Sequence, residues 1–295
     1  MATFLHTRRF LAYHQDRFKD VSLLLANDKG IVGLFPAALD PAEARTVVSH
    51  PGITYGGLLH SGKLHGEKMV TALVKVTDYY AQQGFDILRY KAVPHIYHRR
   101  PSGDDLYALF RTKAACVRRD LSCAIDLLNG SERSSRRRRS LKKALRSGIQ
   151  VSKGPQFISQ LWKLIAENYH RRLNARPVHT EAELRYLYDL FPRNIRFVAG
   201  ILDGEIIAGV VLFYSSSVAH AQYIASSEVG YDVCALDAVF EYAIEQAKVE
   251  RCRFFDFGTS NNDEGRYLST NVYNFKTEFG AGGVVHEFYE FDLTV

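Results

Sequence analysis

The chain has 295 residues, a formal net charge of +6 and 46% hydrophobic residues, a composition typical of a globular protein with one large or two smaller domains. No apolar run reaches the roughly 20 residues of a membrane-spanning helix, and no apolar run follows the basic N-terminus as in a signal peptide, so we expect a cytoplasmic protein. The four cysteines form no C-x-x-C pair and have no histidine at metal-ligand spacing, which predicts reduced thiols and no metal site.

The N-terminal half begins with a predicted β-hairpin. A β-rich run from Val21 to Asn27 is followed by the turn Asp28-Lys29-Gly30 and then by a second β-rich run. Helical periodicity extends from Met69 to Gln83 and ends at Gly84, and the strand-like sequence FDILRYKAV follows. This half is therefore expected to form a hairpin, a helix and a strand, in that order.

A basic segment follows. Residues 131–148 read SERSSRRRRSLKKALRSG, which predicts a basic helix with Gly148 as its C-cap. Two further helices are predicted, one from Pro155 to Arg172 and one from Thr180 to Leu190. Thr180 is the expected N-cap of the second helix, because Glu183 stands three residues later in a capping-box pattern.

The order of hairpin, helix and strand recurs roughly 170 residues later, which is the pattern of an internal repeat. β-rich runs surround Asp203-Gly204, a helix is predicted from Leu236 to Val249, and the strand-like sequence CRFFDFG comes next. Gly265–Phe279 is then predicted to be helical, and Val284–Leu293 to be an edge or closing strand. The repeat predicts a duplicated α/β unit with mixed sheets.

Between Phe254 and Phe291 the chain has a strand ending in D-F-G, a polar loop, a helix ending in F-K-x-x-F-G and a last strand. This order of elements and motifs resembles the closing segment of Fem-like and GNAT-like acyltransferases. SHPGITYGGLL (Ser49–Leu59) is similar to the substrate-cleft loop of this group, and RRRRSLKKALRSGI (Arg136–Ile149) to its basic helix. The resemblance implies an α/β fold of two tandem GNAT-like units with mixed, mostly antiparallel sheets packed side by side. The expected units are residues 1–130 and 151–295, joined by a basic linker helix at 131–150.

The resemblance also implies N-acyl transfer to an amine, here expected on a nucleotide- or lipid-linked sugar or peptide precursor of the cell envelope or capsule. The expected donor is acetyl-CoA or another acyl-CoA. However, the GNAT pyrophosphate loop, Q/R-x-x-G-x-G/A, would fall within Ser226–Cys234, where only Gly230 fits. An aminoacyl-tRNA-dependent transferase of the Fem type is therefore one alternative, and a non-catalytic module that binds nucleotide-sugars or RNA is another. No DNA-binding signature is present, and the basic charge is compatible with peripheral membrane contact.

Acyl transfer requires hydrogen-bond donors for an oxyanion and a route for the amine proton. Lys276 matches the lysine of the family motif and is expected to stabilise negative charge. Asp256 ends the strand FFDFG and is expected to orient or deprotonate the amine. His50 is a candidate general base, because imidazole titrates near neutrality. Each of the three has a structural alternative: Lys276 as a solvated surface lysine, Asp256 as a cap of the following loop, and His50 as a structural histidine.

Further candidates are expected to bind the substrate. They lie in the glycine-containing loop after Ser49, on the helix after Pro155, on a central strand and in the tail. The alternative for each residue is a structural role in a turn, in the core or on the surface. They are Tyr55, Gly56, Gly57, Tyr169, Arg172, Tyr223, Asn261 and Phe275. On the basic helix, Arg139, Lys142, Lys143 and Arg146 share one stripe. Arg139, Lys142 and Lys143 are predicted to bind phosphate, the alternative being a solvated face.

Overall fold

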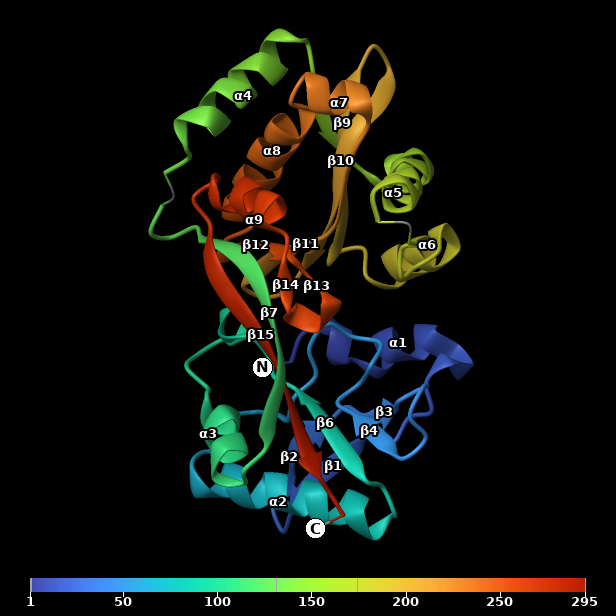
Figure 1. The fold of residues 1–295 in the computed structure, drawn as a ribbon, viewed down its shortest axis with the longest axis vertical. Coiled ribbons are helices and arrows are strands. Elements are labelled where there is room, and N and C mark those ends of the chain that lie inside the picture. The colour runs from blue at the N-terminus through green and yellow to red at the C-terminus, as the bar shows by residue number, and fades with distance from the viewer. Residues whose placement is uncertain (1, 131, 174, 295) are drawn as a thin grey trace. The chain divides into compact units, whose positions relative to one another are not determined.

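The computed structural model describes residues 2–130, 132–173 and 175–294 (Figure 1). The chain divides into two compact units, each built from separate stretches of sequence. Unit 1 comprises Met1–Leu121, Asn261–Leu268 and Val284–Val295, and unit 2 comprises Ser122–Ser260 and Ser269–Gly283. Within the described ranges, no helix is long and apolar enough to cross a membrane.

Unit 1 combines a β-hairpin, a mixed sheet and short helices. Its elements are η1 (Phe4–His6), α1 (Arg8–Leu11), η2 (Ala12–Arg17), β1 (Leu23–Asn27), β2 (Gly30–Phe35), β3 (Ala38–Leu39), β4 (Thr46–Val48), β5 (Leu59–His60), α2 (Glu67–Gln82), β6 (Ile87–Lys91), η3 (His95–Tyr97), α3 (Asp104–Arg111), most of β7 (Ala115–Asp126), β13 (Asn261–Asn262), η5 (Asp263–Gly265), β14 (Tyr267–Leu268) and most of β15 (Gly282–Asp292).

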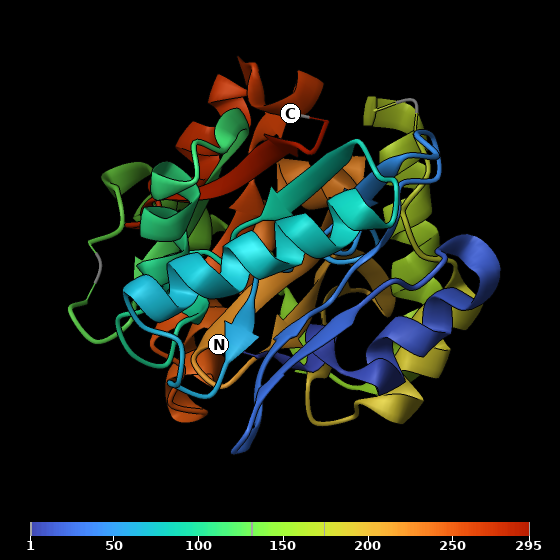
Figure 2. The same ribbon diagram turned by 90° about the horizontal axis from the view of Figure 1, so that it is seen from below.

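The predicted N-terminal hairpin and the helix after it are confirmed. β1 pairs antiparallel with β2, and the turn closes between Asn27 and Gly30, whose φ of +104° favours glycine. The apolar face of α2 carries Met69, Leu73 and Tyr80 into the core of unit 1, so the helix lies across the strands, as Figure 2 shows.

The sheet of unit 1 corrects one prediction. Its strand order is β3-β4-β6-β15-β7, with β4 parallel to β6 and β15 antiparallel to β6. Of the two roles predicted for Val284–Leu293, the edge strand is wrong, because β15 lies between β6 and β7, where it closes the sheet. Its partner β6 lies about 200 residues earlier in the sequence, and local sequence patterns carry no information on such a pairing.

Unit 2 is a mixed sheet with helices on both faces. Its elements are the end of β7, α4 (Ser135–Arg146), β8 (Gln150–Lys153), η4 (Pro155–Phe157), α5 (Ile158–Leu173), α6 (Glu181–Leu190), β9 (Ile195–Leu202), β10 (Glu205–Tyr214), β11 (Val218–Ser226), α7 (Glu228–Asp232), α8 (Ala235–Val249), β12 (Phe254–Thr259) and α9 (Thr270–Thr277).

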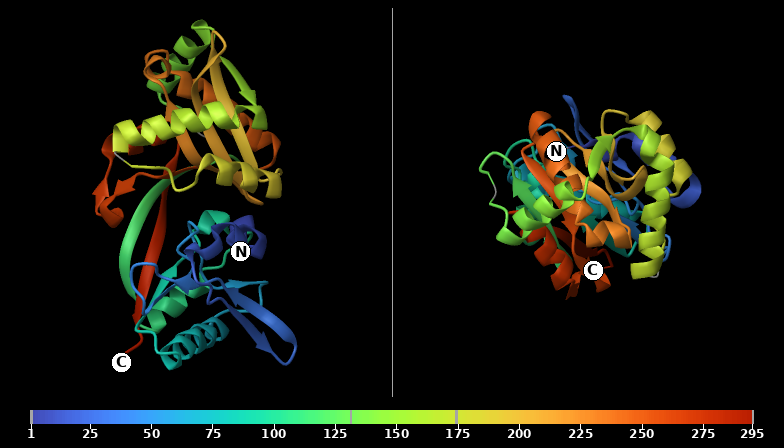
Figure 3. Two further views of the ribbon diagram at one scale, coloured as in Figure 1. Left: turned by 90° about the vertical axis from the view of Figure 1, so that its right-hand side faces the viewer. Right: turned by 90° about the horizontal axis from the view of Figure 1, so that it is seen from above.

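The strand order of unit 2 is β7-β12-β11-β10-β9-β8, and only the β11–β12 pair is parallel. Helices α4 and α8 cover one face, and α5 and α6 cover the other (Figures 1 and 3). The core under α8 includes Phe240, Phe255 and Phe257, and burying each such side chain contributes roughly 1.5–3 kcal/mol. The predicted hairpin around Asp203-Gly204 is confirmed as β9–β10, and the capping box of Thr180 and Glu183 is present in α6.

The basic segment is not a linker, which corrects the expected boundaries at 130 and 150. The predicted helix is present as α4, with Ser134 as N-cap, but it packs on α8 inside unit 2. Arg137 is 6% exposed, and its guanidinium forms an ion pair of 3.0 Å with the buried Asp237. Ser131, where the linker was expected to begin, lies outside the described residues.

The helix predicted at Gly265–Phe279 is wrong in its first part. β13 and β14 form a small antiparallel pair, and α9 begins only at Thr270. Glu264 and Gly265 have φ values of +49° and +87°, which a right-handed helix does not allow. A Cβ atom on Gly265 would lie 2.1 Å from the carbonyl oxygen of Arg119, so this close approach requires glycine.

Candidate active site

Two parallel strands separate in the middle of unit 2. β11 and β12 pair from Val218 with Phe254 to His220 with Asp256, and β11 then continues to Ser226 without further pairing to β12. We call the place where they part the fork. Strands that separate leave backbone N–H and C=O groups on their facing edges, and these groups are able to bind an extended ligand.

A β-bulge lies beside the fork. Opposite β10, Val211 pairs with Tyr223 and Leu212 pairs with Ala221, so Gln222 is the extra residue of β11. Bulges turn the backbone and redirect side chains, and they are frequent next to active sites.

A histidine and an aspartate face each other at the last pair before the fork. Nδ1 of His220 lies 2.8 Å from Oδ2 of Asp256. Asp256 is fully buried, and its Oδ1 accepts hydrogen bonds from Oγ of Ser122 and from the backbone N–H of Gly258 at 2.9 Å. The His220 side chain is 14% exposed. An aspartate that accepts from Nδ1–H leaves the lone pair of the imidazole on Nε2, which is the arrangement of a general base.

Lys276 lies close to this pair, but it is neither solvated nor free. It is 4% exposed, and its Nζ donates to the carbonyl oxygens of Gly258 and Thr259, both at 2.7 Å. The lysine thus joins α9 to the end of β12 and retains one further N–H bond. Burial lowers its pKa to about 8, and electrostatic attraction from Cys123 and Asp256 opposes this effect.

The structure thus brings Asp256 and Lys276 together around the end of β12. His220, Ser122 and Cys123 were not predicted from the sequence. Nothing local marks these three residues, because they join the group only through the pairing of β12 with β11 on one side and β7 on the other.

His50 belongs to unit 1 and is 3% exposed. Its Nδ1 accepts a hydrogen bond from the backbone N–H of Gly52 at 3.2 Å. Burial, together with the charges of His14 and Lys91, lowers its pKa to about 3. At neutral pH the ring is uncharged and is a weak base.

The predicted substrate loop of unit 1 is packed against its own surroundings. Tyr55 is 3% exposed and its ring contacts that of Tyr97 at a centroid distance of 4.3 Å. A Cβ on Gly56 would lie 1.8 Å from the carbonyl oxygen of Ser49, and Gly57 has a φ of +69°. The N–H of Gly56 donates to the carbonyl of Lys91, so the two glycines shape a tight buried turn.

The candidates on α5 and β11 form part of the packing beneath α5. Tyr223 is 2% exposed, its hydroxyl lies 2.5 Å from Nδ1 of His179, and the ring of Tyr169 packs edge-on against its ring. Arg172 lies on α5, but its side chain lies outside the described part of the structure.

Two candidates of the tail have internal partners. The side chain of Asn261 accepts from the N–H of Leu121 and donates to the carbonyl of Gly265 at 3.1 Å, so it holds the β13 turn against β7. The ring of Phe275 lies 5.2 Å from that of Phe279 and 4.9 Å from the guanidinium carbon of Arg137.

The exposed face of α4 is basic. Its buried residues are Arg137 and Ala144, and its exposed basic residues are spread around the rest of the helix, with Arg136 paired to Glu278 at 3.4 Å. They are Arg136, Arg138, Arg139, Lys142, Lys143 and Arg146.

Gly230 has a packing role. Its N–H donates to Oγ of Ser227, and a Cβ would lie 2.3 Å from the carbonyl of Ile207. The glycine therefore allows α7 to approach β10. Across the described residues, no group of three or more His, Cys, Asp or Glu side chains is placed to hold a metal ion.

Comparisons with known proteins agree with this fold. Residues 131–269 match the family described as Acetyltransferase (GNAT) domain. No curated protein sequence matches the chain significantly. Among solved structures, FemX has a TM-score of 0.70 at 12% identity, covering 97% of this chain and 91% of that one.

Two further structures have the same fold. The C-terminal domain of a putative lysylphosphatidylglycerol synthetase from Agrobacterium fabrum has a TM-score of 0.63 at 11% identity, covering 91% of this chain and 83% of that one. A tandem GNAT protein from the clavulanic acid biosynthesis pathway has a TM-score of 0.52 at 10% identity, with coverages of 95% and 85%. The chain thus has a Fem-like, GNAT-type fold, and residues 131–269 are similar to a GNAT acetyltransferase domain. The resemblance noted in the sequence is confirmed.

Proposed function

We propose that this Fem-like GNAT protein transfers an acyl group from a thioester donor to an amine, and that the transfer takes place at the fork of unit 2. The observation that carries the proposal is the hydrogen bond between His220 and Asp256 at the last strand pair before the fork. A buried carboxylate that fixes the tautomer of a partly exposed histidine is a recurrent device for proton abstraction.

The proposed reaction assigns one task to each group. The amine attacks the acyl carbonyl carbon, a C–N bond forms, and the C–S bond of the donor breaks. Nε2 of His220 accepts the amine proton and passes it to the leaving thiolate, while Asp256 stabilises the transient imidazolium. The remaining N–H of Lys276 is directed to the developing oxyanion, where a fixed positive charge lowers the barrier. His50, predicted from the sequence as a general base, has no role in this proposed reaction.

An acyl-CoA is the donor proposed first, and the acceptor is an amine of a nucleotide- or lipid-linked envelope precursor. A second donor, aminoacyl-tRNA, is favoured by one observation: α4 carries six exposed basic side chains, of which Arg136 pairs with Glu278. Such a surface attracts a polyanion, and the binding would weaken as salt neutralises the phosphates. Acetyl-CoA raises the melting temperature if the first proposal holds. Salt-sensitive binding of tRNA without an effect of acetyl-CoA supports the second donor.

The test of the site compares His220→Asn and Asp256→Asn with the parent chain. Thiol release from acetyl-CoA is measured against a panel of amino sugars and amino-sugar nucleotides. Each variant is expected to lower kcat by roughly 10²- to 10⁴-fold, with a small effect on KM, because general-base catalysis is lost while binding remains. His170→Asn, on the exposed side of α5, is the matched control and leaves kcat unchanged. Full activity in His220→Asn contradicts the proposed role of this site.

A further inference from the structure

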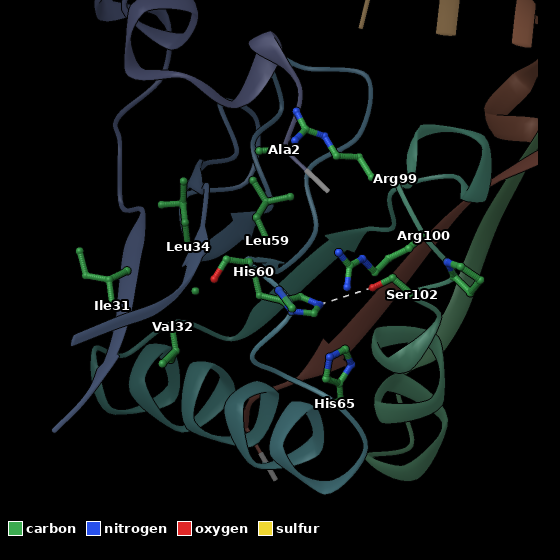
Figure 4. A pocket seen from close by; sticks show the side chains of 14 residues that line it. Ala2, Ile31, Val32, Leu34, Leu59, His60, His65, Arg99, Arg100 and Ser102 are labelled. Atoms are coloured by element: carbon green, nitrogen blue, oxygen red, sulfur yellow. Dashed lines mark hydrogen bonds between the residues drawn. The ribbon is translucent and has the colours of Figure 1, made fainter. Parts of the chain in front are cut away.

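Unit 1 contains a cavity of about 530 Å³ that has no part in the proposed transfer (Figure 4). It lies where β2, β5 and the loop between η3 and α3 meet. Two arginines and two histidines contribute to its wall, and the described residues that line it include no aspartate or glutamate.

One side of the cavity is polar and its donors are already oriented. Nδ1 of His60 accepts hydrogen bonds from the backbone N–H groups of Gly62 at 3.2 Å and of Leu64 at 3.3 Å. A neutral imidazole whose Nδ1 accepts must carry its proton on Nε2. Nε2 of His60 lies 3.5 Å from Oγ of the buried Ser102, so this N–H is directed to the polar side of the cavity.

The charges around His60 are unbalanced. The ring of His65 lies 5.6 Å from that of His60, and in Figure 4 the side chain of Arg100 extends toward His60 and Ser102. The nearby carboxylate of Asp104 is engaged by the N–H of Gly66 at 2.8 Å and by His65 at 3.5 Å. The guanidinium of Arg100 has no ion pair among the described contacts, so the polar side has a surplus of donors and positive charge.

The other side of the cavity is apolar. β2 contributes Ile31, Val32 and Leu34, and Ile31 is 59% exposed. An exposed branched aliphatic side chain beside cationic groups suits a ligand with one anionic end and one apolar end.

We infer that this cavity binds a phosphate-bearing ligand, with the phosphate against His60, Arg100 and Ser102 and an apolar portion against β2. A phosphomonoester carries close to two negative charges at pH 7 and offers three acceptor oxygens. A guanidinium, an imidazole N–H and a hydroxyl satisfy these oxygens from different directions, and guanidinium groups bind phosphate through paired hydrogen bonds. A monoanionic carboxylate offers fewer acceptors and less charge, so it fits this wall less well.

The test measures binding to the full chain by calorimetry, with octyl phosphate, orthophosphate and octanoate as probes. Octyl phosphate is expected to bind saturably to one site, more tightly than orthophosphate because its chain covers β2. Arg100→Gln is expected to weaken it about tenfold or more through loss of a charge-assisted hydrogen bond. Arg45→Gln is the matched control, because Arg45 is an arginine of the same unit that pairs with Asp86 outside the cavity.

A second readout reports on His60 itself. Burial and the charge of His65 lower the pKa of His60 in the free protein, whereas Asp104 opposes this shift. A dianion beside Nε2 raises that pKa, and this increase is visible in the pH titration of the ring signals by NMR. The proposal is overturned if octyl phosphate shows no saturable binding up to about 10 mM. It is also overturned if octanoate binds equally well, or if Arg45→Gln weakens binding as much as Arg100→Gln.

Discussion

Replacement of Lys276 by methionine is expected to change how the stability of the protein depends on pH. The ammonium group is 4% exposed, and burial lowers its pKa from 10.5 to about 8. Above about pH 8 the folded chain releases this proton, whereas the unfolded chain retains it up to about pH 10.5. In this window the unfolded state binds more protons, so the free energy of unfolding rises with pH.

The size of the effect follows from the two pKa values. At about 1.4 kcal/mol per pKa unit, the difference between 10.5 and about 8 corresponds to at most about 3.5 kcal/mol over the whole titration, most of which falls between pH 8 and 10.5. Lys276→Met lacks this contribution and leaves the carbonyl oxygens of Gly258 and Thr259 without their donor. That loss is independent of pH, so it shifts the stability of the variant by a constant amount.

The assay is urea unfolding of both proteins at a series of pH values, followed by circular dichroism. The unfolding free energy of the parent minus that of the variant is expected to rise by up to about 3 kcal/mol between pH 8 and 10.5. Lys163→Met, at an exposed position of α5, is the control and gives no such rise. A difference that stays flat across this window refutes the reasoning. If the positive charge also serves the reaction, kcat of the parent falls as pH rises above about 8.

Two further substitutions test the packing inside each unit. Asp237→Ala removes one of the two carboxylates that pair with the buried guanidinium of Arg137 at 3.0 Å, the other being Glu278, and is expected to lower the free energy of unfolding by about 1.5–3 kcal/mol in urea titrations; a double variant with Arg137→Met should recover most of it, and no recovery argues against a charge effect. Gly56→Ala places a methyl group 1.8 Å from the carbonyl of Ser49, so we expect a loss of several kcal/mol or failure to fold. Gly62→Ala is its control, since that site has a positive φ but open space, and an equal loss in both variants contradicts the clash.

Much of the fold could be predicted because its signals are local. The turn at Asn27–Gly30 and the capping box of Thr180 and Glu183 depend on residues a few positions apart, and both are present. The helix predicted to begin at Gly265 starts later in the structure because a distant contact decides the conformation there. Gly265 lies against the backbone of Arg119, and this contact joins parts of the chain that are far apart in sequence.

The candidate site was only partly predictable. Asp256 and Lys276 were identified through a motif in one continuous stretch of sequence. His220 was missed because its role depends on the register of β11 against β12, which sets it opposite Asp256 across 36 positions of sequence. The same limit applies to Ser122, which reaches Asp256 from β7. Side chains that meet through strand pairing are invisible to a search for spacing along the chain.

The interior position of β15 has a consequence for synthesis. This strand carries residues 282–292, so the ribosome makes it after the other strands of the sheet in unit 1. Until then β6 and the first part of β7 lack the partner that lies between them, and their exposed edges are open to wrong pairing. The N-terminal part of unit 1 therefore cannot complete its sheet until residues 282–292 have been made.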